Sequence, residues 1–414
     1  MSRNHLKNCQ KDFPSLAHHP NVLHLDGPAG TQVPQAVMDA MNDYYIKANA
    51  NTHGYFAATK ETDHILAEVR RKMAALLAAE GPHTISFGQN MTTLNYSLSR
   101  AIARGLKAGD EIVITQLDHE ANRGPWLGLE EQGIVVKELP LLPSGTLDYA
   151  AIDDTITERA KLVAIGLASN ALGTINEIAP IRARAKKVGA WLLLDAVHYA
   201  PHLLLDVQAL DCDFLLCSAY KFYGPHVGIL YSRPGLLDTI DTDRLATQDQ
   251  VAPYKIETGT LNHAAIAGVG AAVDYMAGFG QGDDLRSQIV NAMSFINAHE
   301  FGLAKKLYQG LSEIPGLTLF GPTFDDHLRA PTIAFTLNGW RPEQVCSALD
   351  QSDIYAWDGH FYALRAIEIL GLLEQGGVTR MGISIYNTEH ETDKVIAIVT
   401  NLAQSAPVAV ANHN

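Results

Sequence analysis

Cysteine is scarce in this sequence, because 414 residues include only Cys9, Cys212, Cys217 and Cys346. Four thiols are too few for a disulfide framework, and their spacing matches no zinc motif. We therefore expect neither structural disulfides nor a metal site. The first residues, MSRNHLKNCQKDF, lack the apolar core of a signal peptide, so we expect a soluble protein that stays in the cytoplasm.

Positive charge is also in short supply. Lys and Arg number 31 against 45 Asp and Glu, which gives a net charge of −14. Nucleic acids and anionic membranes are themselves negative, so the sequence predicts neither as a partner. No apolar run approaches the roughly 20 residues needed to span a bilayer. Because 47% of residues are hydrophobic and only 18% are charged, we expect a globular chain of two or three structural units.

Two common nucleotide-binding motifs are missing. No GxGxxG follows the first predicted strand, and no GxxxxGK[ST] occurs. Instead, apolar runs alternate with helix-like stretches, and continuous apolar runs are typical of strands covered on both faces. The predicted strands are HTISFG (83–88), EIVITQLDH (111–119), KLVAIGLASN (161–170), WLLLDAVH (191–198), DFLLCSAYK (213–221) and VGILYSR (227–233). This alternation predicts an α/β fold with a mostly parallel sheet.

The C-terminal part has a different pattern of short strands and flanking helices. The predicted elements are a helix from Asp284 to about Gly310, the strands LTLFGP, PTIAFTLNG and VTRMGISIYN, a helix from Pro342 to Asp350, and a last helix near Glu389 to Gln404. This pattern predicts a smaller α+β domain. We expect an N-terminal arm at 1–22 packed on the small domain, a large domain at 23–300 and a small domain at 301–414.

Polar residues follow the central strands where each one ends. In an open α/β sheet, ligands bind outside the carboxyl ends of the strands, so these residues are expected to meet in one cleft. A single polar residue at a strand end is more often a turn or cap residue, and the convergence of several carries the prediction. They are Asn90, His119, Asn170, Asp195, His198, Ser218 and Lys221.

Two of these residues form an informative pair. Asp195 follows four apolar residues, and a buried carboxylate needs a cation or strong donors. It could cap the next helix or hold a cationic ring nitrogen. Lys221 follows an apolar strand, where desolvation would lower its pKa and suit it to form a Schiff base, although an exposed lysine is the commoner case. Together they match the needs of pyridoxal phosphate.

A phosphate site is expected in QNMTTLNYSLSRAIA (89–103), which is predicted to be a loop that enters a helix. The free N–H groups and the dipole of a helix N-terminus favour phosphate. Plain N-capping by Asn90 explains the same residues equally well.

Longer motifs of the chain resemble the class V aminotransferase group of fold-type I pyridoxal-phosphate enzymes, and most of all its branch of cysteine desulfurases and selenocysteine lyases. The resemblance covers about residues 22–405. The matching motifs are LDGPAG (25–30), DHEAN (118–122), SNALGT (169–174), LLDAVH (193–198), LDCDFLLCSAYKFYGP (210–225), IETGTLN (256–262) and TRMGISIYNT (379–388). It implies a fold-type I transferase fold, pyridoxal 5'-phosphate as cofactor, an amino acid as substrate, and a homodimer with the site at the subunit interface.

The resemblance also implies a role for each matching residue. Lys221 would bond to the cofactor and move the Cα proton, His119 would stack on the pyridine ring, and Asp195 would hold the ring nitrogen. His198 would reach the ring oxygen, where many relatives have Gln, and Arg380 would clamp the substrate carboxylate together with Asn170, which lies beside the ring. The phosphate would be bound by Asn90, Met91, Thr92 and Ser218, by Tyr220 where many desulfurases have His, and by Thr260 of the partner subunit.

The sequence departs from the desulfurases in one loop. They carry a catalytic cysteine just before the arginine segment, whereas YAWDGHFYALRA (355–366) has Tyr362 at that position. Cys212 and Cys217 are expected to be inert core residues. Trp357, Asp358, His360 and Tyr362 either shape the substrate pocket or simply pack the loop.

These observations predict an enzyme that breaks the C–S bond of an amino acid by β-elimination, without a thiol that carries a persulfide. His360 or Tyr362 would protonate the leaving group. A class V aminotransferase or an amino-acid epimerase would use the same Lys221, Asp195 and Arg380 and is the alternative. A cofactor-binding paralogue without activity is the third reading.

Overall fold

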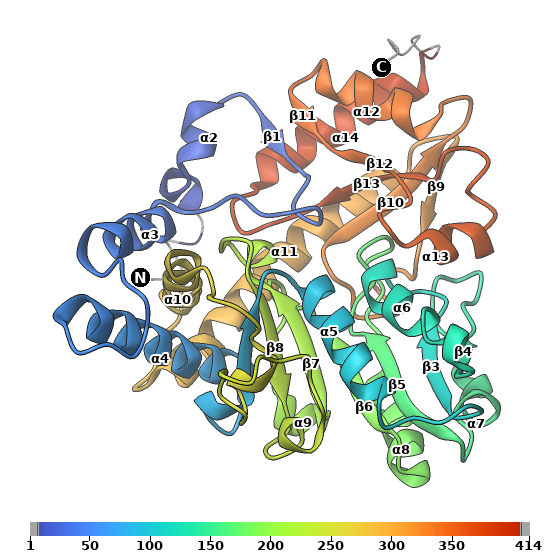
Figure 1. Ribbon diagram of the computed structural model, residues 1–414. Coiled ribbons are helices and arrows are strands. Elements are labelled where there is room, and N and C mark those ends of the chain that lie inside the picture. Colours follow the sequence, from blue (N-terminus) through green and yellow to red (C-terminus); the bar gives the residue numbers. More distant parts are fainter. Residues whose placement is uncertain (1–5, 7, 406, 408–414) are drawn as a thin grey trace.

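The fold was analysed in a computed structural model, which describes residues 6, 8–405 and 407. Within these residues the large sheet has seven strands in the order β2-β8-β7-β6-β5-β3-β4. β8 runs antiparallel to both of its neighbours, and the other strands run in one direction (Figure 1). The strands are β2 (Ile85–Gly88), β3 (Glu111–Thr115), β4 (Val135–Leu139), β5 (Ala160–Gly166), β6 (Trp191–Asp195), β7 (Phe214–Ser218) and β8 (Gly228–Ser232). The predicted mostly parallel α/β sheet is confirmed.

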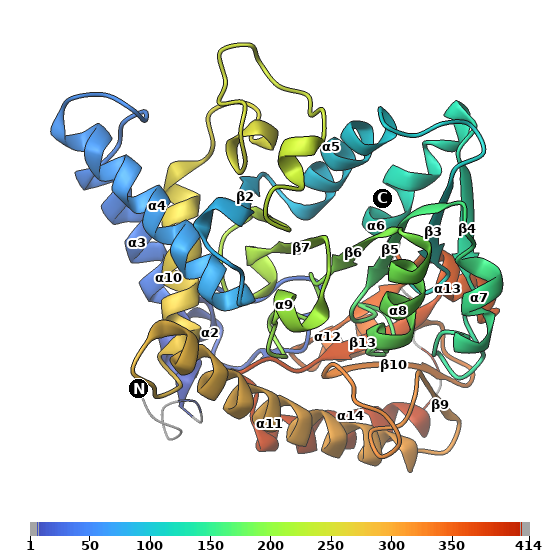
Figure 2. The same cartoon turned by 90° about the horizontal axis from the view of Figure 1, so that it is seen from below.

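The apolar runs are buried on both faces, as expected for covered strands. On β3, Ile112 and Ile114 belong to one apolar cluster and Val113 belongs to another, because successive side chains point to opposite faces. The first cluster includes residues of α5 (Met91–Ala103) and α6 (Glu120–Leu127). The second includes residues of α4 (Ala57–Leu77), α8 (Ile178–Val188), α10 (His263–Ala277) and α11 (Leu285–Ser312). Figure 2 shows α3 (Gln35–Lys47), α4 and α10 side by side.

A second sheet of four strands, counted over the described residues, forms the C-terminal part. Its antiparallel order is β12 (Trp357–Gly359), β13 (Val378–Gly382), β10 (Thr332–Leu337) and β9 (Leu317–Phe320). It shares an apolar cluster with α11, α12 (Pro342–Asp350) and α14 (Glu389–Ala403). In Figure 1 these elements lie above the large sheet, so they face one end of that sheet.

The segment before residue 30 is tied to both parts. β1 (Leu23–His24) pairs in parallel with β11 (Ile354–Tyr355). The Cys9 thiol donates to the carbonyl of Ile385 at 3.3 Å, and the Phe13 ring packs edge-on against three tyrosines, Tyr223, Tyr275 and Tyr386. This segment therefore contacts the large domain as well as the C-terminal part.

The remaining elements are short. They are α2 (Pro14–His18), α7 (Ile152–Thr155), α9 (Val207–Leu210), α13 (Leu364–Ile369), and 3-10 helices at Cys9–Asp12, Pro82–Thr84, Glu130–Gln132, Tyr149–Ala151, Ala219–Lys221, Leu237–Thr239 and Tyr254–Ile256. Among the described residues, no helix combines the length and apolar character needed to cross a membrane.

Candidate active site

The polar residues predicted from the strand ends do converge. β3, β5, β6 and β7 are parallel, so their carboxyl ends lie at one edge of the sheet. This edge faces the C-terminal part of the chain. A cavity of about 650 Å³ opens there. Of the residues predicted for the site, it is lined by Thr92, His119, Asn170, Tyr220, Lys221, His360, Tyr362 and Arg380.

Lys221 lies in the cavity wall at the end of the 3-10 helix that follows β7. Its Nζ donates to the carbonyls of Pro28 and Ala29, the latter at 2.9 Å. Burial and the nearby charge of Arg380 lower the pKa of Lys221 to about 7, although Asp195 acts in the opposite direction. A buried amine with this pKa is neutral often enough at neutral pH to act as a nucleophile.

Asp195 is the last residue of β6 and is buried. One carboxylate oxygen accepts a hydrogen bond from the amide of Val197 at 2.9 Å, and no Lys, Arg or His of the described chain lies within ion-pair distance. Burial raises the pKa of Asp195 to about 6, and the charge of Lys221 partly offsets this rise. A buried carboxylate without a cation is costly, so the site is suited to a cationic ring nitrogen.

The N-terminus of α5 forms the end of the site where phosphate is expected. Asn90 caps this helix by accepting from the amide of Thr93 at 2.9 Å, and the Ser218 hydroxyl accepts from the amide of Met91 at 3.0 Å. Gly228 of β8 lets the backbone at Asn90 approach, because a Cβ on Gly228 would lie 2.4 Å from the Asn90 carbonyl carbon. The capping reading of Asn90 is therefore correct, and the helix dipole still favours an anion at this end.

His119 caps α6, with its Nδ1 accepting from the amide of Ala121 at 2.9 Å. Burial and the charges of Lys221 and Arg380 lower the pKa of His119 to about 4, so the ring is neutral. Its neighbour Asp118 is buried, and its carboxylate accepts from the amide of Gly166 at 2.7 Å. This bond ties the loop after β3 to the end of β5. Burial raises the pKa of Asp118 to about 7, a feature that sequence reasoning missed.

His198 and Thr260 are two predicted residues that do not line the cavity. The His198 Nε2 lies 2.9 Å from the Thr332 hydroxyl, and burial together with His202 holds the pKa of His198 well below its ordinary value. Thr260 lines a different hollow, which also includes Arg70 and Glu257. Asn90, Met91, Asp195 and Ser218 are not among the residues that line the cavity.

Arg380 of β13 is buried on the small-domain side of the cavity. Its Nη1 donates to the Asn170 carbonyl at 2.9 Å, and its Nε has no partner in the described chain. Its Cζ lies 4.0 Å from the ring centroid of Phe361. The Asn170 side-chain oxygen is also buried without a donor. An unpaired buried donor on Arg380 suits the carboxylate of an amino-acid ligand, and an unpaired buried acceptor on Asn170 suits its amine.

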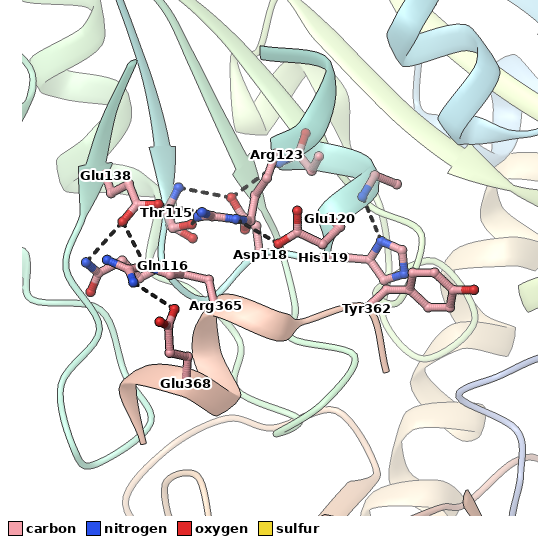
Figure 3. A network of polar contacts seen from close by, with 12 residues as sticks. Thr115, Gln116, Asp118, His119, Glu120, Arg123, Glu138, Tyr362, Arg365 and Glu368 are labelled. Carbon is pink, nitrogen blue, oxygen red and sulfur yellow. Dashed lines mark hydrogen bonds and ion pairs between the residues drawn. The ribbon is translucent and has the colours of Figure 1, made fainter. Parts of the chain in front are cut away.

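The loop between β12 and α13 lines the cavity with His360, Phe361 and Tyr362 and is anchored at several points. Figure 3 shows Tyr362 of this loop beside His119. The Glu120 amide donates to the Tyr362 carbonyl at 2.6 Å, and the Asn170 amide nitrogen donates to the Phe361 carbonyl at 2.8 Å. Phe361 and Tyr362 both have positive φ, 52° and 58°, which is strained for aromatic residues. Such strain persists only where surrounding contacts impose it.

The far end of this loop is held by ion pairs, which Figure 3 also shows. On α13, the Arg365 Nε donates to Glu138 of β4 at 3.1 Å, and its Nη1 donates to Glu368 at 2.8 Å. Glu138 also pairs with the buried Arg123 of α6. The network thus joins α13 of the C-terminal part to the same α6 that His119 caps.

None of the four cysteines, all of which are described, lines the cavity. Burial raises the pKa of the Cys9 thiol to about 12, and burial also raises the pKa of Cys212 and of Cys217. Cys346 lies against Asp358; burial and that carboxylate raise its pKa, so the thiol stays protonated. The prediction that Cys212 and Cys217 are core residues is confirmed.

These residues fit pyridoxal phosphate. A buried amine of lowered pKa, a buried carboxylate without a cation, and a helix N-terminus opposite a close backbone approach all follow or end strands at the edge of the sheet where the cavity opens. They would suit the aldehyde, the ring nitrogen and the phosphate of that cofactor.

Comparisons with known proteins agree with this fit. The family model described as Aminotransferase class-V matches residues 23–395. A cysteine desulfurase of Serratia proteamaculans (strain 568) is 33% identical over 411 residues, which covers 95% of this chain and 97% of the relative. A cysteine desulfurase of Pectobacterium carotovorum (strain PC1) is 31% identical and covers 95% and 96%.

Solved structures give the same result. A cysteine desulfurase from Thermococcus onnurineus superimposes with a TM-score of 0.86 at 27% identity, covering 95% of this chain and 97% of that one. A cysteine desulfurase from Escherichia coli gives 0.84 at 26% identity, covering 96% and 98%. The chain therefore belongs to the class V aminotransferase family, and it is a cysteine desulfurase-like enzyme that depends on pyridoxal phosphate.

Proposed function

We propose that the protein is a lyase that breaks the Cβ–S bond of an amino acid and transfers no persulfide to a cysteine of its own. The observation that carries the proposal is the loop residue Tyr362. It follows the Gly359-His360 pair at the position that the resemblance assigns to the desulfurase cysteine, and it lines the cavity beside His119. The raised pKa of all four cysteine thiols supports it, because only a thiolate is an effective nucleophile.

The residues of the chain divide the work by position. Lys221, Asp195 and the N-terminus of α5 would hold the cofactor at its aldehyde, ring nitrogen and phosphate. When bound, pyridoxal phosphate supplies an electron sink for the carbanion at Cα of the amino acid. Arg380 would hold the α-carboxylate through its planar fork, with Asn170 beside it.

Two proton movements complete the reaction. The Lys221 amine, whose pKa lies near 7, would take the proton from Cα. The leaving sulfur would accept a proton from Tyr362 or His360, both of which line the cavity. The released enamine then reacts with water, so one thioether and one water give a thiol, pyruvate and ammonium. The neutral His119 would cover the ring without adding charge.

We propose further that the protein acts as a homodimer in the cytoplasm, with each site completed by the partner. Thr260 lies outside the cavity of its own chain, which suits a residue that serves a second copy. The loop before α4 carries exposed aromatic side chains, above all Tyr55, with 96% of its surface exposed. They give the second subunit a surface to pack on.

The test is to incubate the cofactor-loaded protein with cysteine, cystine and S-substituted cysteines and to measure pyruvate, with Lys221→Ala as the inactive control. Pyruvate from any of them supports the lyase. Transfer of the amino group to an oxo-acid, or exchange of the Cα proton for deuterium without pyruvate, would instead identify an aminotransferase or an epimerase.

A further inference from the structure

Three large aromatic side chains face the cavity and remain exposed. Tyr96 of α5 is 44% exposed, Trp357 of β12 is 51% exposed and Tyr362 of the loop is 68% exposed. They come from both domains and line the same space as Lys221 and Arg380. Aromatic surface that stays exposed inside a cavity is typical of a site for an apolar ligand.

Two of these aromatic residues, Tyr362 and Trp357, are held in place. The Tyr362 ring stacks on His119 with centroids 5.4 Å apart and planes 24° apart, and its carbonyl accepts the Glu120 amide at 2.6 Å (Figure 3). Trp357 lies on β12, whose register with β13 pairs it with Arg380. We call Tyr96, Trp357 and Tyr362 the aromatic wall of the cavity. Its strand residue Trp357 is fixed relative to Arg380, which favours binding of a rigid apolar group at low entropic cost.

The charges of the cavity limit the substrate further. The residues that line the cavity include one lysine, Lys221, and one arginine, Arg380. In the proposed function both act near Cα of the substrate. The other formal charges are the carboxylates of Glu120 and Asp358, and Glu120 is engaged with Arg123 at 3.1 Å. A second carboxylate on the substrate, beyond Cβ, would meet carboxylates and no lysine or arginine.

We propose that the substrate is a cysteine thioether whose sulfur carries an aromatic or bulky apolar group. This inference rests on the proposed lyase function and names its substrate class. The Cα–H and Cβ–S bonds break, the sulfur leaves as an apolar thiol with a proton from the protein, and water converts the enamine to pyruvate and ammonium. Free cysteine would leave the aromatic wall wet, and cystine would bring a second carboxylate.

The experiment uses the cofactor-loaded full chain and compares kcat/KM for pyruvate from four substrates. They are S-benzylcysteine, S-methylcysteine, S-carboxymethylcysteine and cysteine. We expect S-benzylcysteine to exceed S-methylcysteine at least tenfold, since one methylene in an apolar pocket already gives about tenfold or more. We expect S-carboxymethylcysteine to be poorer than S-methylcysteine.

Two variants and one binding measurement locate the effect. Trp357→Ala should lower the benzyl-to-methyl ratio at least fivefold, whereas Val290→Ala, an exposed apolar position on α11, should leave the ratio unchanged. Phenylalanine, which has no leaving group, should shift the cofactor absorbance at a lower concentration than alanine does.

The outcomes separate the two proposals. If thioethers give pyruvate but benzyl and methyl substrates are used equally, the substrate class is wrong and the lyase stands. If phenylalanine binds better than alanine but no thioether gives pyruvate, the lyase is wrong and the aromatic preference stands. If Trp357→Ala converts a dimer to monomers and leaves the ratio intact, the wall serves the subunit interface and the inference is overturned.

Discussion

Tyr362 stacks on His119, with ring centroids 5.4 Å apart and planes at 24° (Figure 3). The two residues come from opposite parts of the chain, because His119 begins α6 on the large domain and Tyr362 lies in the loop before α13. Stacked pairs of this kind contribute about 1 kcal/mol beyond the area they bury. The contact therefore helps to hold the loop over the cavity, and what anchors the loop should also affect turnover.

The Arg365–Glu138 ion pair should matter more for activity than for stability. Arg365→Ala removes the anchor of the loop, and we expect kcat/KM to fall about fivefold or more. The pair is partly exposed, so the free energy of unfolding should fall by at most about 1 kcal/mol. Steady-state kinetics and urea unfolding measure both effects. Arg365→Lys should recover part of the activity. The control is Lys186→Ala on α8, which removes an exposed ion pair with Asp211 and should change neither kcat/KM nor the free energy of unfolding. Equal activity of Arg365→Ala and the unchanged protein would show that the anchor has no role.

Arg380→Lys should weaken the substrate carboxylate contact although it keeps the charge. A lysine lacks the planar fork, and loss of a buried charged contact costs about 2 kcal/mol or more, which corresponds to about 30-fold in kcat/KM. Kinetics with the best thioether measure the loss. Arg341→Lys, on an exposed arginine paired with Glu343, is the control and should stay within twofold. A KM unaffected by Arg380→Lys would assign the carboxylate to another residue.

Cofactor loading should depend on pH through Lys221. Because burial lowers the pKa of this lysine to about 7, the neutral amine increases as pH rises through 7, and the loading rate should rise with it and level off well below pH 10. The time course of cofactor absorbance, after pyridoxal phosphate is added to the cofactor-free protein at each pH, measures the rate. Arg380→Met removes a neighbouring positive charge, so it should move the midpoint to higher pH. A midpoint near 10 would mean that Lys221 is solvated like a free lysine.

Cys346→Ala should leave pyruvate formation intact. Its thiol is the least buried of the four and lies nearest the loop, but burial and Asp358 raise its pKa and keep it protonated. We expect activity within about twofold of the unchanged protein. A tenfold loss in a variant with an unchanged circular dichroism spectrum and unfolding midpoint would assign a role to this thiol.

Thr260 offers a test of the dimer. Light scattering should give the mass of two chains. Thr260→Ala and Lys221→Ala should each be impaired alone, whereas mixing and refolding them together should restore about a quarter of the sites, because the mixed dimer has one site with both residues intact. No recovery on mixing would place Thr260 outside the partner's site.

The sequence allowed the large sheet and the lysine to be located because apolar strands and their polar ends are local patterns. α12 spans Pro342–Asp350 as expected, and Asp284 caps α11. β4 was missed because its residues VVKEL are half-exposed and carry charges, so they form no apolar run. The predicted strands also ran too far: β3 ends at Thr115, four residues before His119.

Contacts between distant segments could not be predicted. The Asp118 carboxylate accepts a hydrogen bond from the Gly166 amide, and Arg365 donates to Glu138. The two partners in each pair lie far apart in the sequence, so no local pattern indicates the contact. The side chain of His198 turns to Thr332 rather than to the cavity, a rotamer that the sequence does not encode locally. The roles of the site residues stay predictions, as does the domain boundary at residue 300, through which α11 runs without a break.

The pairing of β1 with β11 has a consequence for how the protein is made. β1 (Leu23–His24) leaves the ribosome long before its partner strand β11 (Ile354–Tyr355) has been made. The carbonyls of Pro28 and Ala29, which hold Lys221, come within five residues of the end of β1. The part of the site that these two carbonyls form can thus be completed only after β11 has been made, since contacts so far apart in sequence form late. Trimming the first 25 residues, or fusing a bulky domain to them, should therefore delay maturation of the enzyme, whereas a tag at the C-terminal end should not.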